Sequence, residues 1–129
     1  MTVSHTLLLL PERYGVVKLA PGIQMDSAGE SRTDLLAVIH TPEETTVVCK
    51  EHIIPKKEIV EKGWRALKVA GVLEFELVGV LASLLSPLAE AGVSVFTLST
   101  YSTDFILVKG DSLDKAVETL KKAGHRIIE

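Results

Sequence analysis

The 129-residue sequence is poor in several features that would define a function class. It has a single cysteine, so the chain cannot form an internal disulfide, and we expect a reducing compartment. The formal net charge is −3, which argues against the clustered Lys and Arg of a nucleic-acid-binding surface. No glycine-rich phosphate-binding motif occurs. We therefore expect neither a nucleic-acid partner nor a nucleotide cofactor.

Long hydrophobic runs are also absent near the start of the sequence. Residues 7–10 are four leucines, too few for a membrane span or a signal peptide, and no positively charged segment precedes them. We expect a cytoplasmic protein with no membrane partner. Hydrophobic residues still make up 47% of the chain, enough for the buried core of one domain or of two very small ones.

Residue types that bind metals or act in catalysis are scattered. Cys49 and His52 form an isolated C-x-x-H pair, so we expect no metal site and no cofactor. Nucleophilic catalysis by a cysteine and a histidine needs a third, orienting group and an oxyanion site, and the sequence marks neither. We interpret Cys49 as a small buried hydrophobic residue and expect no enzymatic activity.

The first half of the chain is rich in β-forming residues. We expect strands at Thr6–Leu10, Tyr14–Leu19, Leu35–Ile39 and Thr45–Cys49. A turn at residues 11–13 should separate the first two strands, and the last two should form a hairpin. Residues 24–33 are polar and predict a loop. The charged segment after Pro55 suits one short helical turn that ends at Gly63.

The second half alternates strand and helix patterns. After a strand at Trp64–Val69, we expect β 72–78, α 80–91, β 93–98, β 104–108, α 112–123 and β 125–128. Pro87 predicts a kink in the first helix, with Ser83 or Ser86 satisfying the freed carbonyl, and Asp111 is expected to cap the second helix. This order is that of a ferredoxin-like α+β sandwich, with two helices on one face of an antiparallel sheet.

Residues 63–125 resemble an ACT domain, a small regulatory module that binds amino acids. The segments that carry the resemblance are GWRALKVAG (63–71), GVLASLLSPLAEAGVSVFTLSTYSTDFILV (79–108) and KKAGH (121–125). Residues 34–55 resemble the degenerate first unit of short bacterial proteins with two such units in tandem. The paired arrangement is also similar to the ACT pairs of eukaryotic cytosolic arginine sensors.

The resemblance implies a domain division and a ligand site. We expect a degenerate, mostly β ACT-like unit at residues 1–62, with a boundary as late as residue 70, and an ACT domain at residues 63–129. The ligand would lie between ACT units. Carried over by position, the ligand-binding residues are Val78, Gly79, Val80, Leu81, Ser99, Thr100, Tyr101, Thr103 and Asp104, with Val38, His40 and Thr41 from the first unit.

The chemistry of these residues suits a zwitterion. Backbone N–H groups that begin the helix after Gly79 form a seat for a carboxylate, and the Asp104 carboxylate suits an ammonium group. Simpler interpretations exist: the residues from Ser99 to Thr103 also fit a polar hairpin that needs no ligand, and Asp104 also fits a strand-edge charge that faces water.

Together these observations predict a non-catalytic protein that binds an amino acid or a related metabolite and changes its association on doing so. We expect a homodimer, with the exposed strand 93–98 as a contact. One alternative is a structural or protein-interaction module that has lost ligand binding, because the site lacks a basic residue for the ligand carboxylate. Another is a small enzyme of ferredoxin-like fold, which turnover abolished by Asp104→Ala would indicate.

Overall fold

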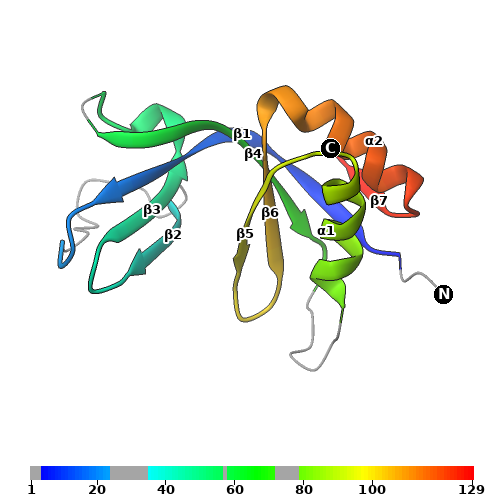
Figure 1. Cartoon of the computed structure of the whole chain (residues 1–129), viewed down its shortest axis with the longest axis horizontal. Coiled ribbons are helices and arrows are strands. Elements are labelled where there is room, and N and C mark those ends of the chain that lie inside the picture. The colour runs from blue at the N-terminus through cyan, green and yellow to red at the C-terminus, as the bar shows by residue number, and fades with distance from the viewer. Residues whose placement is uncertain (1–3, 24–34, 57, 72–78) are drawn as a thin grey trace. The chain divides into compact units, whose positions relative to one another are not determined.

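The computed structural model describes residues 4–23, 35–56, 58–71 and 79–129. By its internal contacts the chain divides into two compact units (Figure 1). We call Met1–Pro11 together with Arg65–Glu129 the helical unit, and Glu12–Trp64 the strand unit. Among the described residues, each unit has its own cluster of buried hydrophobic side chains.

The helical unit contains the two α-helices of the described chain. Its elements are β1 (Thr6–Leu19), β4 (Ile59–Val69), α1 (Val80–Glu90), β5 (Val95–Ser99), β6 (Asp104–Lys109), the 3-10 turn η4 (Gly110–Ser112), α2 (Leu113–Lys122) and β7 (Arg126–Ile128). Strands β1 and β4 also contribute residues to the strand unit. From β4 onward the order is β-α-β-β-α-β, so the predicted α+β fold class is confirmed. The strand predicted at 72–78 lies outside the described residues.

Helices α1 and α2 cover one face of the strands in the helical unit (Figure 1). Leu84 and Leu88 of α1 are one turn apart and completely buried, which is the spacing that places two side chains on the same face of a helix. Leu67 and Val69 of β4 alternate onto the same face. The buried cluster consists of Leu7, Leu67, Val69, Val80, Leu84, Leu88, Val93, Ile106, Val108, Ala116 and Leu120.

Strand β1 occupies a position that a four-stranded ferredoxin-like sheet lacks. It pairs in parallel with β7, with Thr6 opposite Arg126, and it neighbours β4, where the Ala70 N–H donates to the Thr6 carbonyl at 2.8 Å. Strands β6 and β5 follow β4, and β5 ends the order of described strands. The last strand, β7, is therefore separated from β4, the first strand of the β-α-β-β-α-β series, by the amino-terminal strand β1. One edge of β5 pairs with no other strand of the described residues.

The predicted turn at Pro11 is wrong, because β1 is one strand from Thr6 to Leu19. The strand pairs with β7 as far as Leu8 and with β3 (Thr45–Lys50) from Tyr14 onward. Pro11 falls between these two registers, where its missing N–H leaves both ladders intact.

The strand unit contains β2 (Leu35–His40), β3 and the 3-10 turn η3 (Glu51–Ile53), besides its parts of β1 and β4. Strands β2 and β3 pair antiparallel, which confirms the predicted hairpin. Its buried cluster consists of Val17, Val47, Cys49 and Ile54, with Leu19, Val38, Ile53 and Val60 partly buried against it. Cys49 is a buried member of this small core, as interpreted from the sequence. The loop predicted at 24–33 lies outside the described residues.

Three local predictions are wrong. The helical turn expected after Pro55 lies before it, at η3, because the Glu51 carboxylate accepts the Gly63 N–H at 2.9 Å and the chain from Ile59 onward is strand. Asp111 does not cap α2, because the 3-10 turn η4 places it one residue before the N-cap position. The carbonyl freed by Pro87 lies 3.1 Å from the Nε2 of His125, the residue before β7, and no serine of α1 satisfies it.

Candidate functional site

The start of α1 is built on a glycine. Gly79 has φ of +82°, a left-handed conformation that glycine adopts without steric cost, and it occupies the N-cap position. The helix has no side-chain cap, and its first turn has no acidic residue. The first helical bond runs from the Ser83 N–H to the Gly79 carbonyl at 2.9 Å. The N–H groups that open α1 therefore keep the partial positive charge that attracts an anion.

The β5–β6 hairpin is held by its own polar groups. The Ser99 hydroxyl donates to the Asp104 carboxylate at 2.5 Å, across a directly opposed pair of the ladder. The Thr100 N–H donates to the Thr103 carbonyl at 2.8 Å, and the Thr103 hydroxyl donates to the Val69 carbonyl at 2.7 Å. The hydroxyl-rich sequence thus fixes the shape of the hairpin and ties it to the end of β4.

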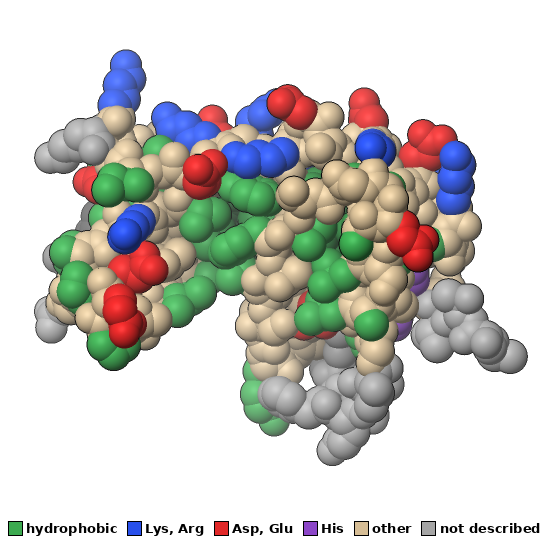
Figure 2. Space-filling view, in the orientation of Figure 1, with side chains coloured by type: hydrophobic (Ala, Val, Ile, Leu, Met, Phe, Trp, Pro, Cys, Tyr) green, Lys and Arg blue, Asp and Glu red, His purple; other side chains and the backbone are tan. Residues whose placement is uncertain are grey.

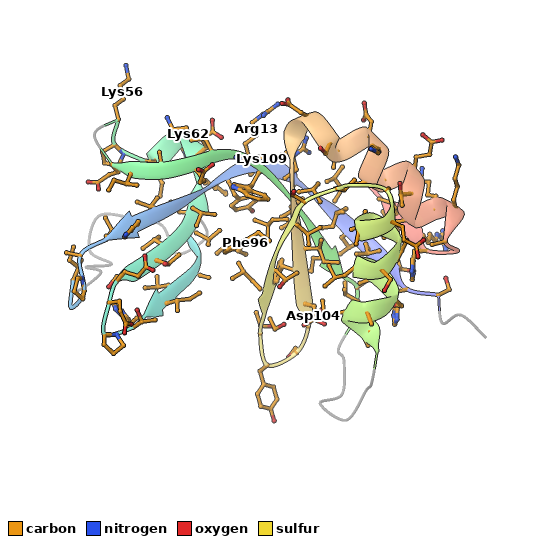
Figure 3. The ribbon with its side chains drawn as sticks, in the orientation of Figure 1. Arg13, Lys56, Lys62, Phe96, Asp104 and Lys109 are labelled. Atoms are coloured by element: carbon orange, nitrogen blue, oxygen red, sulfur yellow. The ribbon has the colours of Figure 1, made fainter. Side chains whose placement is uncertain are left out.

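The helix start and the hairpin lie at the same end of the helical unit. Thr103 is bonded to Val69, the last residue of β4, and α1 runs back from that end (Figure 1). Asp104 lies at this end of β6, and Lys109 lies at the other end (Figure 3). The structure therefore brings two of the sequence-predicted segments, the start of α1 and the hairpin, to one end of the fold.

The individual predicted residues differ in exposure. Val80 is buried in the core, so only its backbone is available to a ligand, whereas Asp104 is partly buried. Tyr101 is 82% exposed at the tip of the hairpin. Leu81 packs against the core from a partly buried position, and Val78 lies outside the described residues. The assignment of these residues to a ligand site stays a prediction.

Val38, His40 and Thr41 belong to the strand unit. Val38 packs against the small core, and the His40 Nδ1 is 3.2 Å from the Thr45 hydroxyl. The Thr41 hydroxyl donates to the Glu44 carbonyl at 2.9 Å and so closes the turn between β2 and β3. Each of these contacts stabilises the β2–β3 hairpin, and a ligand contact from these residues also stays a prediction.

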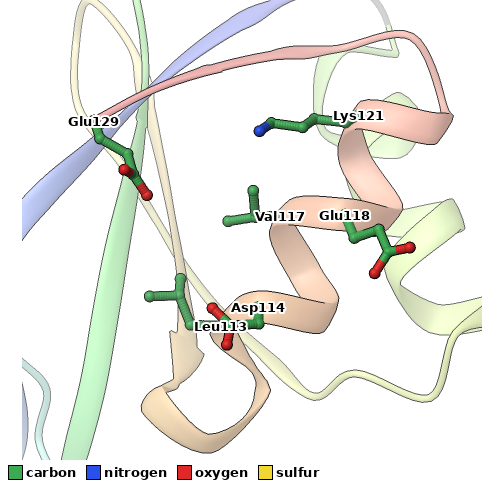
Figure 4. Close-up of a pocket in the computed structure, with 6 residues that line it drawn as sticks. All are labelled: Leu113, Asp114, Val117, Glu118, Lys121 and Glu129. Atoms are coloured by element: carbon green, nitrogen blue, oxygen red, sulfur yellow. The ribbon is translucent and has the colours of Figure 1, made fainter.

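A half-open pocket of about 220 Å³ lies elsewhere on the helical unit (Figure 4). Its lining is Leu113, Asp114, Val117, Glu118, Lys121 and Glu129, and includes no residue of the sequence-predicted site. The lining includes three carboxyl groups and one ammonium group, and the Glu118 carboxylate pairs with Lys122 at 3.1 Å. A zwitterionic ligand needs donors for its carboxylate, so the charge of this pocket suits it less well than the start of α1.

Among the described residues, the pKa values of Tyr14 and His5 are shifted from their usual values. Burial raises the pKa of Tyr14 in β1, and the nearby Glu12 raises it further. Partial burial lowers the pKa of His5, and its interaction with His125 lowers it further. The His5–His125 pair was not anticipated from the sequence, because the two residues are far apart in the chain and meet only through the parallel pairing of β1 and β7.

The surface charges of the described residues are mixed. On the face seen in Figure 2, Lys and Arg side chains lie among Asp and Glu side chains. None of the helices in the described part of the chain is long and apolar enough to cross a membrane.

A β-α-β-β-α-β unit with both helices on one face of its strands is the architecture of an ACT module. Residues 59–122 match the family model of the ACT domain. Through this domain the chain belongs to the ACT family, as the sequence resemblance indicated. The match leaves the predicted division into units at 1–62 and 63–129 untested.

Two relatives of this chain are named as cytosolic arginine sensors. The chain is 35% identical over 103 residues to "Cytosolic arginine sensor for mTORC1 subunit 1" of Bos taurus and 36% identical over 101 residues to that of Homo sapiens. These alignments cover 71% and 70% of this chain and 31% of each relative. The chain thus spans about a third of the length of these relatives.

Two solved structures show the same fold. Protein Atu0741 of Agrobacterium tumefaciens superposes with a TM-score of 0.88 at 28% identity, covering 98% of this chain and 93% of that one. The regulatory subunit of aspartate kinase from Thermus thermophilus superposes with a TM-score of 0.64 at 11% identity, covering 96% and 99%. The second is a likeness of fold alone.

Proposed function

We propose that this chain is a non-catalytic regulatory protein whose ACT domain binds an amino acid or a related small metabolite. The ACT domain itself and the 35% and 36% identity to proteins named as arginine sensors support a regulatory role for a small ligand. Because those relatives are named as cytosolic, we also propose a cytoplasmic location.

One structural observation carries the binding proposal. The uncapped start of α1 and the Asp104 carboxylate lie at the same end of the helical unit. The N–H groups after Gly79 would receive the carboxylate of the ligand, and Asp104 would receive its ammonium group. Ser99 holds the Asp104 carboxylate through its hydroxyl, so the side chain is oriented before a ligand arrives.

The open edge of β5 suggests how binding would be read out. A second copy of the chain can add its own β5 to this edge and form a homodimer. A ligand that binds the associated form more tightly than the free form shifts the population toward association. The proposed regulation is therefore a change of association state, coupled to ligand binding.

Calorimetric titration and thermal shift with each of the twenty amino acids test the proposal. A ligand present at 100 times its Kd raises the stability by about 2.7 kcal/mol, which a thermal shift detects. Asp104→Asn should abolish this gain by removing the charge, whereas Ser99→Ala should weaken it, because the carboxylate remains but is less well oriented. Asp114→Asn, an exposed carboxylate on α2, is the matched control and should bind normally.

A second candidate function is a protein-interaction module that binds no ligand. It is favoured by the hairpin itself, in which the hydroxyls of Ser99 and Thr103 already have partners within the protein. If no amino acid stabilises the wild-type chain at millimolar concentration while it still dimerises in sedimentation experiments, this second function replaces the first.

A further inference from the structure

His125 connects three elements of the helical unit. It precedes β7 and is only 4% exposed. Its Nε2 lies 3.1 Å from the Ser83 carbonyl oxygen of α1, and its Nδ1 lies 3.1 Å from the backbone nitrogen of His5, just before β1. Both ring nitrogens of one buried side chain therefore bond to backbone groups of two other segments.

The carbonyl that His125 binds is one that α1 cannot satisfy. In a helix the Ser83 carbonyl would accept the N–H of the residue four positions later, which here is Pro87 and has no N–H. The Ser83 hydroxyl is engaged elsewhere, since it donates to the Val80 carbonyl at 2.7 Å. An unpaired carbonyl that is shielded from water is costly, and in this partly buried contact His125 replaces the hydrogen bond that Pro87 removes.

These two contacts fix the protonation state of the ring. A carbonyl oxygen only accepts, so the Nε2 must carry a hydrogen, and a backbone N–H only donates, so the Nδ1 must be bare. The observed arrangement therefore requires neutral His125. A proton added to the Nδ1 would point at the His5 N–H and break that contact.

A second histidine lies against this ring. The rings of His5 and His125 stack with centroids 5.7 Å apart and planes 15° from parallel. The last turn of α2 adds the exposed Lys121 and Lys122, and β7 begins with the exposed Arg126. The one titratable residue of α1, Glu90, ends that helix, seven positions beyond Ser83. The described charged groups that the neighbouring elements bring to this corner are therefore Lys121, Lys122 and Arg126, together with the Glu118 carboxylate, which is paired with Lys122 at 3.1 Å.

We propose that His125 is a proton-sensitive latch that holds the first half of α1 against the paired ends of β1 and β7. The neutral ring closes the latch through its two backbone contacts, and protonation opens it at the His5 N–H. The same corner is closed by the Arg126 N–H donating to the His5 carbonyl at 2.9 Å and the Ser4 hydroxyl donating to the Gly124 carbonyl at 2.6 Å. The proposal needs no ligand and stands independently of the proposed function.

The direction of the pH effect follows from His5. Its pKa in the folded protein is below the usual 6.5, mainly because of burial, so the unfolded chain binds the proton more readily. The contribution of neutral His5 to the stability of the fold is complete above pH 6.5 and is lost as the pH falls below 6.5 and through the lowered pKa. Acid therefore weakens the corner at which the latch lies.

Nuclear magnetic resonance of the wild-type chain tests the latch directly. At about pH 7.5, His125 should show the tautomer with hydrogen on the Nε2 and a bare Nδ1. On lowering the pH to about 5, the protection factor of the His5 amide should fall about tenfold, as expected for one lost hydrogen bond, while that of Val93 in the same unit stays constant. A hydrogen on the Nδ1 at neutral pH, or an unchanged His5 protection factor, overturns the proposal.

A variant that does not titrate separates the latch from general acid effects. Gln at position 125 offers an amide donor and acceptor but takes up no proton in this range, so His125→Gln should reduce the acid-induced fall in the urea midpoint, while the contribution from burial of His5 remains. His52→Gln, at an exposed histidine of η3, is the matched control and should leave the fall unchanged. Equal falls in wild type and His125→Gln would refute the latch.

The proline supplies a further test that holds even if His125 variants are unstable. Pro87→Ala gives α1 its own N–H for the Ser83 carbonyl, so replacing His125 should cost less in that background. The urea midpoint should fall less from Pro87→Ala to Pro87→Ala/His125→Leu than from wild type to His125→Leu. Additive effects of the two changes would mean that His125 and Pro87 act independently, and the latch would be wrong.

Discussion

The two compact units of this chain bury their hydrophobic residues by different means. The helical unit covers its strands with α1 and α2, and eleven described residues form its buried cluster. In the described part of the strand unit, the 3-10 turn η3 is the one helical element beside the strands, and four described residues form its cluster. Since apolar burial is the main stabilising term, the comparison teaches that the helices, rather than the strands, set how much a unit contributes to stability.

Truncating one core residue in each unit should show this difference most strongly. Leu84→Ala removes a fully buried side chain from the helical unit and should cost about 3–5 kcal/mol, whereas Ile54→Ala in the strand unit should cost about 2 kcal/mol, the lower end of the range. Urea unfolding measures both. Ser86→Ala, on the exposed face of α1, is the control and should stay within about 0.5 kcal/mol of wild type. A larger loss from Ile54→Ala would reverse the comparison.

Overpacking sharpens the comparison within the strand unit. A Cβ added at Gly15 would overlap the Cδ1 of Ile54 and lie 3.1 Å from a methyl group of Val60, so Gly15→Ala should cost about 1–3 kcal/mol. Ile54→Val deletes the obstructing methyl group and should restore part of that loss in the double variant, although alone it destabilises. Urea midpoints of the four proteins measure the coupling, and strictly additive losses would show that the core rearranges elsewhere.

The same contrast explains what the sequence could predict. In the helical unit, apolar residues spaced by three and four and the glycines near helix ends define α1 and α2 locally, so their bounds were predicted within one or two residues. The strand unit and β1 depend on pairing between distant segments. Pro11 looks like a turn in sequence, and only the two different partners of β1 explain why the strand continues through it.

In the candidate site too, features that depend on local sequence could be predicted, whereas contacts between strands could not. The Gly79 turn and the hydroxyls of the hairpin are local signals, and the structure brings them to one end of the helical unit. The hydrogen bond from Ser99 to Asp104 depends on the register of the β5–β6 pairing, which sets the two residues opposite each other. That register depends on the geometry of the turn, which the sequence alone does not specify. His125 could not be predicted, because its role depends on a carbonyl freed by Pro87 and on the pairing of both chain ends.

The smallest expected effect concerns the stability of the protein at alkaline pH, which depends on Tyr14 of the strand unit. Burial, and then Glu12, raise the pKa of Tyr14 in the strand unit above the usual 10.0. The Tyr14 hydroxyl therefore keeps its proton to a higher pH in the folded chain than in the unfolded chain. The resulting stability is complete below pH 10.0 and is lost as the pH rises through the raised pKa. Tyr14→Phe, a change that nearly conserves volume, should therefore alter stability by less than about 1.5 kcal/mol at neutral pH and flatten the alkaline fall.

Two variants serve as references for Tyr14→Phe. Tyr101→Phe changes a tyrosine that is 82% exposed and should leave the alkaline fall unchanged. His5→Phe, in the helical unit, should flatten the acid fall and leave the alkaline one, because the pKa of His5 is shifted in the opposite direction. Unfolding measured across both pH ranges thus tests whether the loss of stability in acid comes from the helical unit and the loss in alkali, the alkaline limb, from the strand unit. If Tyr14→Phe and Tyr101→Phe behave alike in alkali, burial of the Tyr14 hydroxyl does not contribute, and the assignment of the alkaline limb to the strand unit fails.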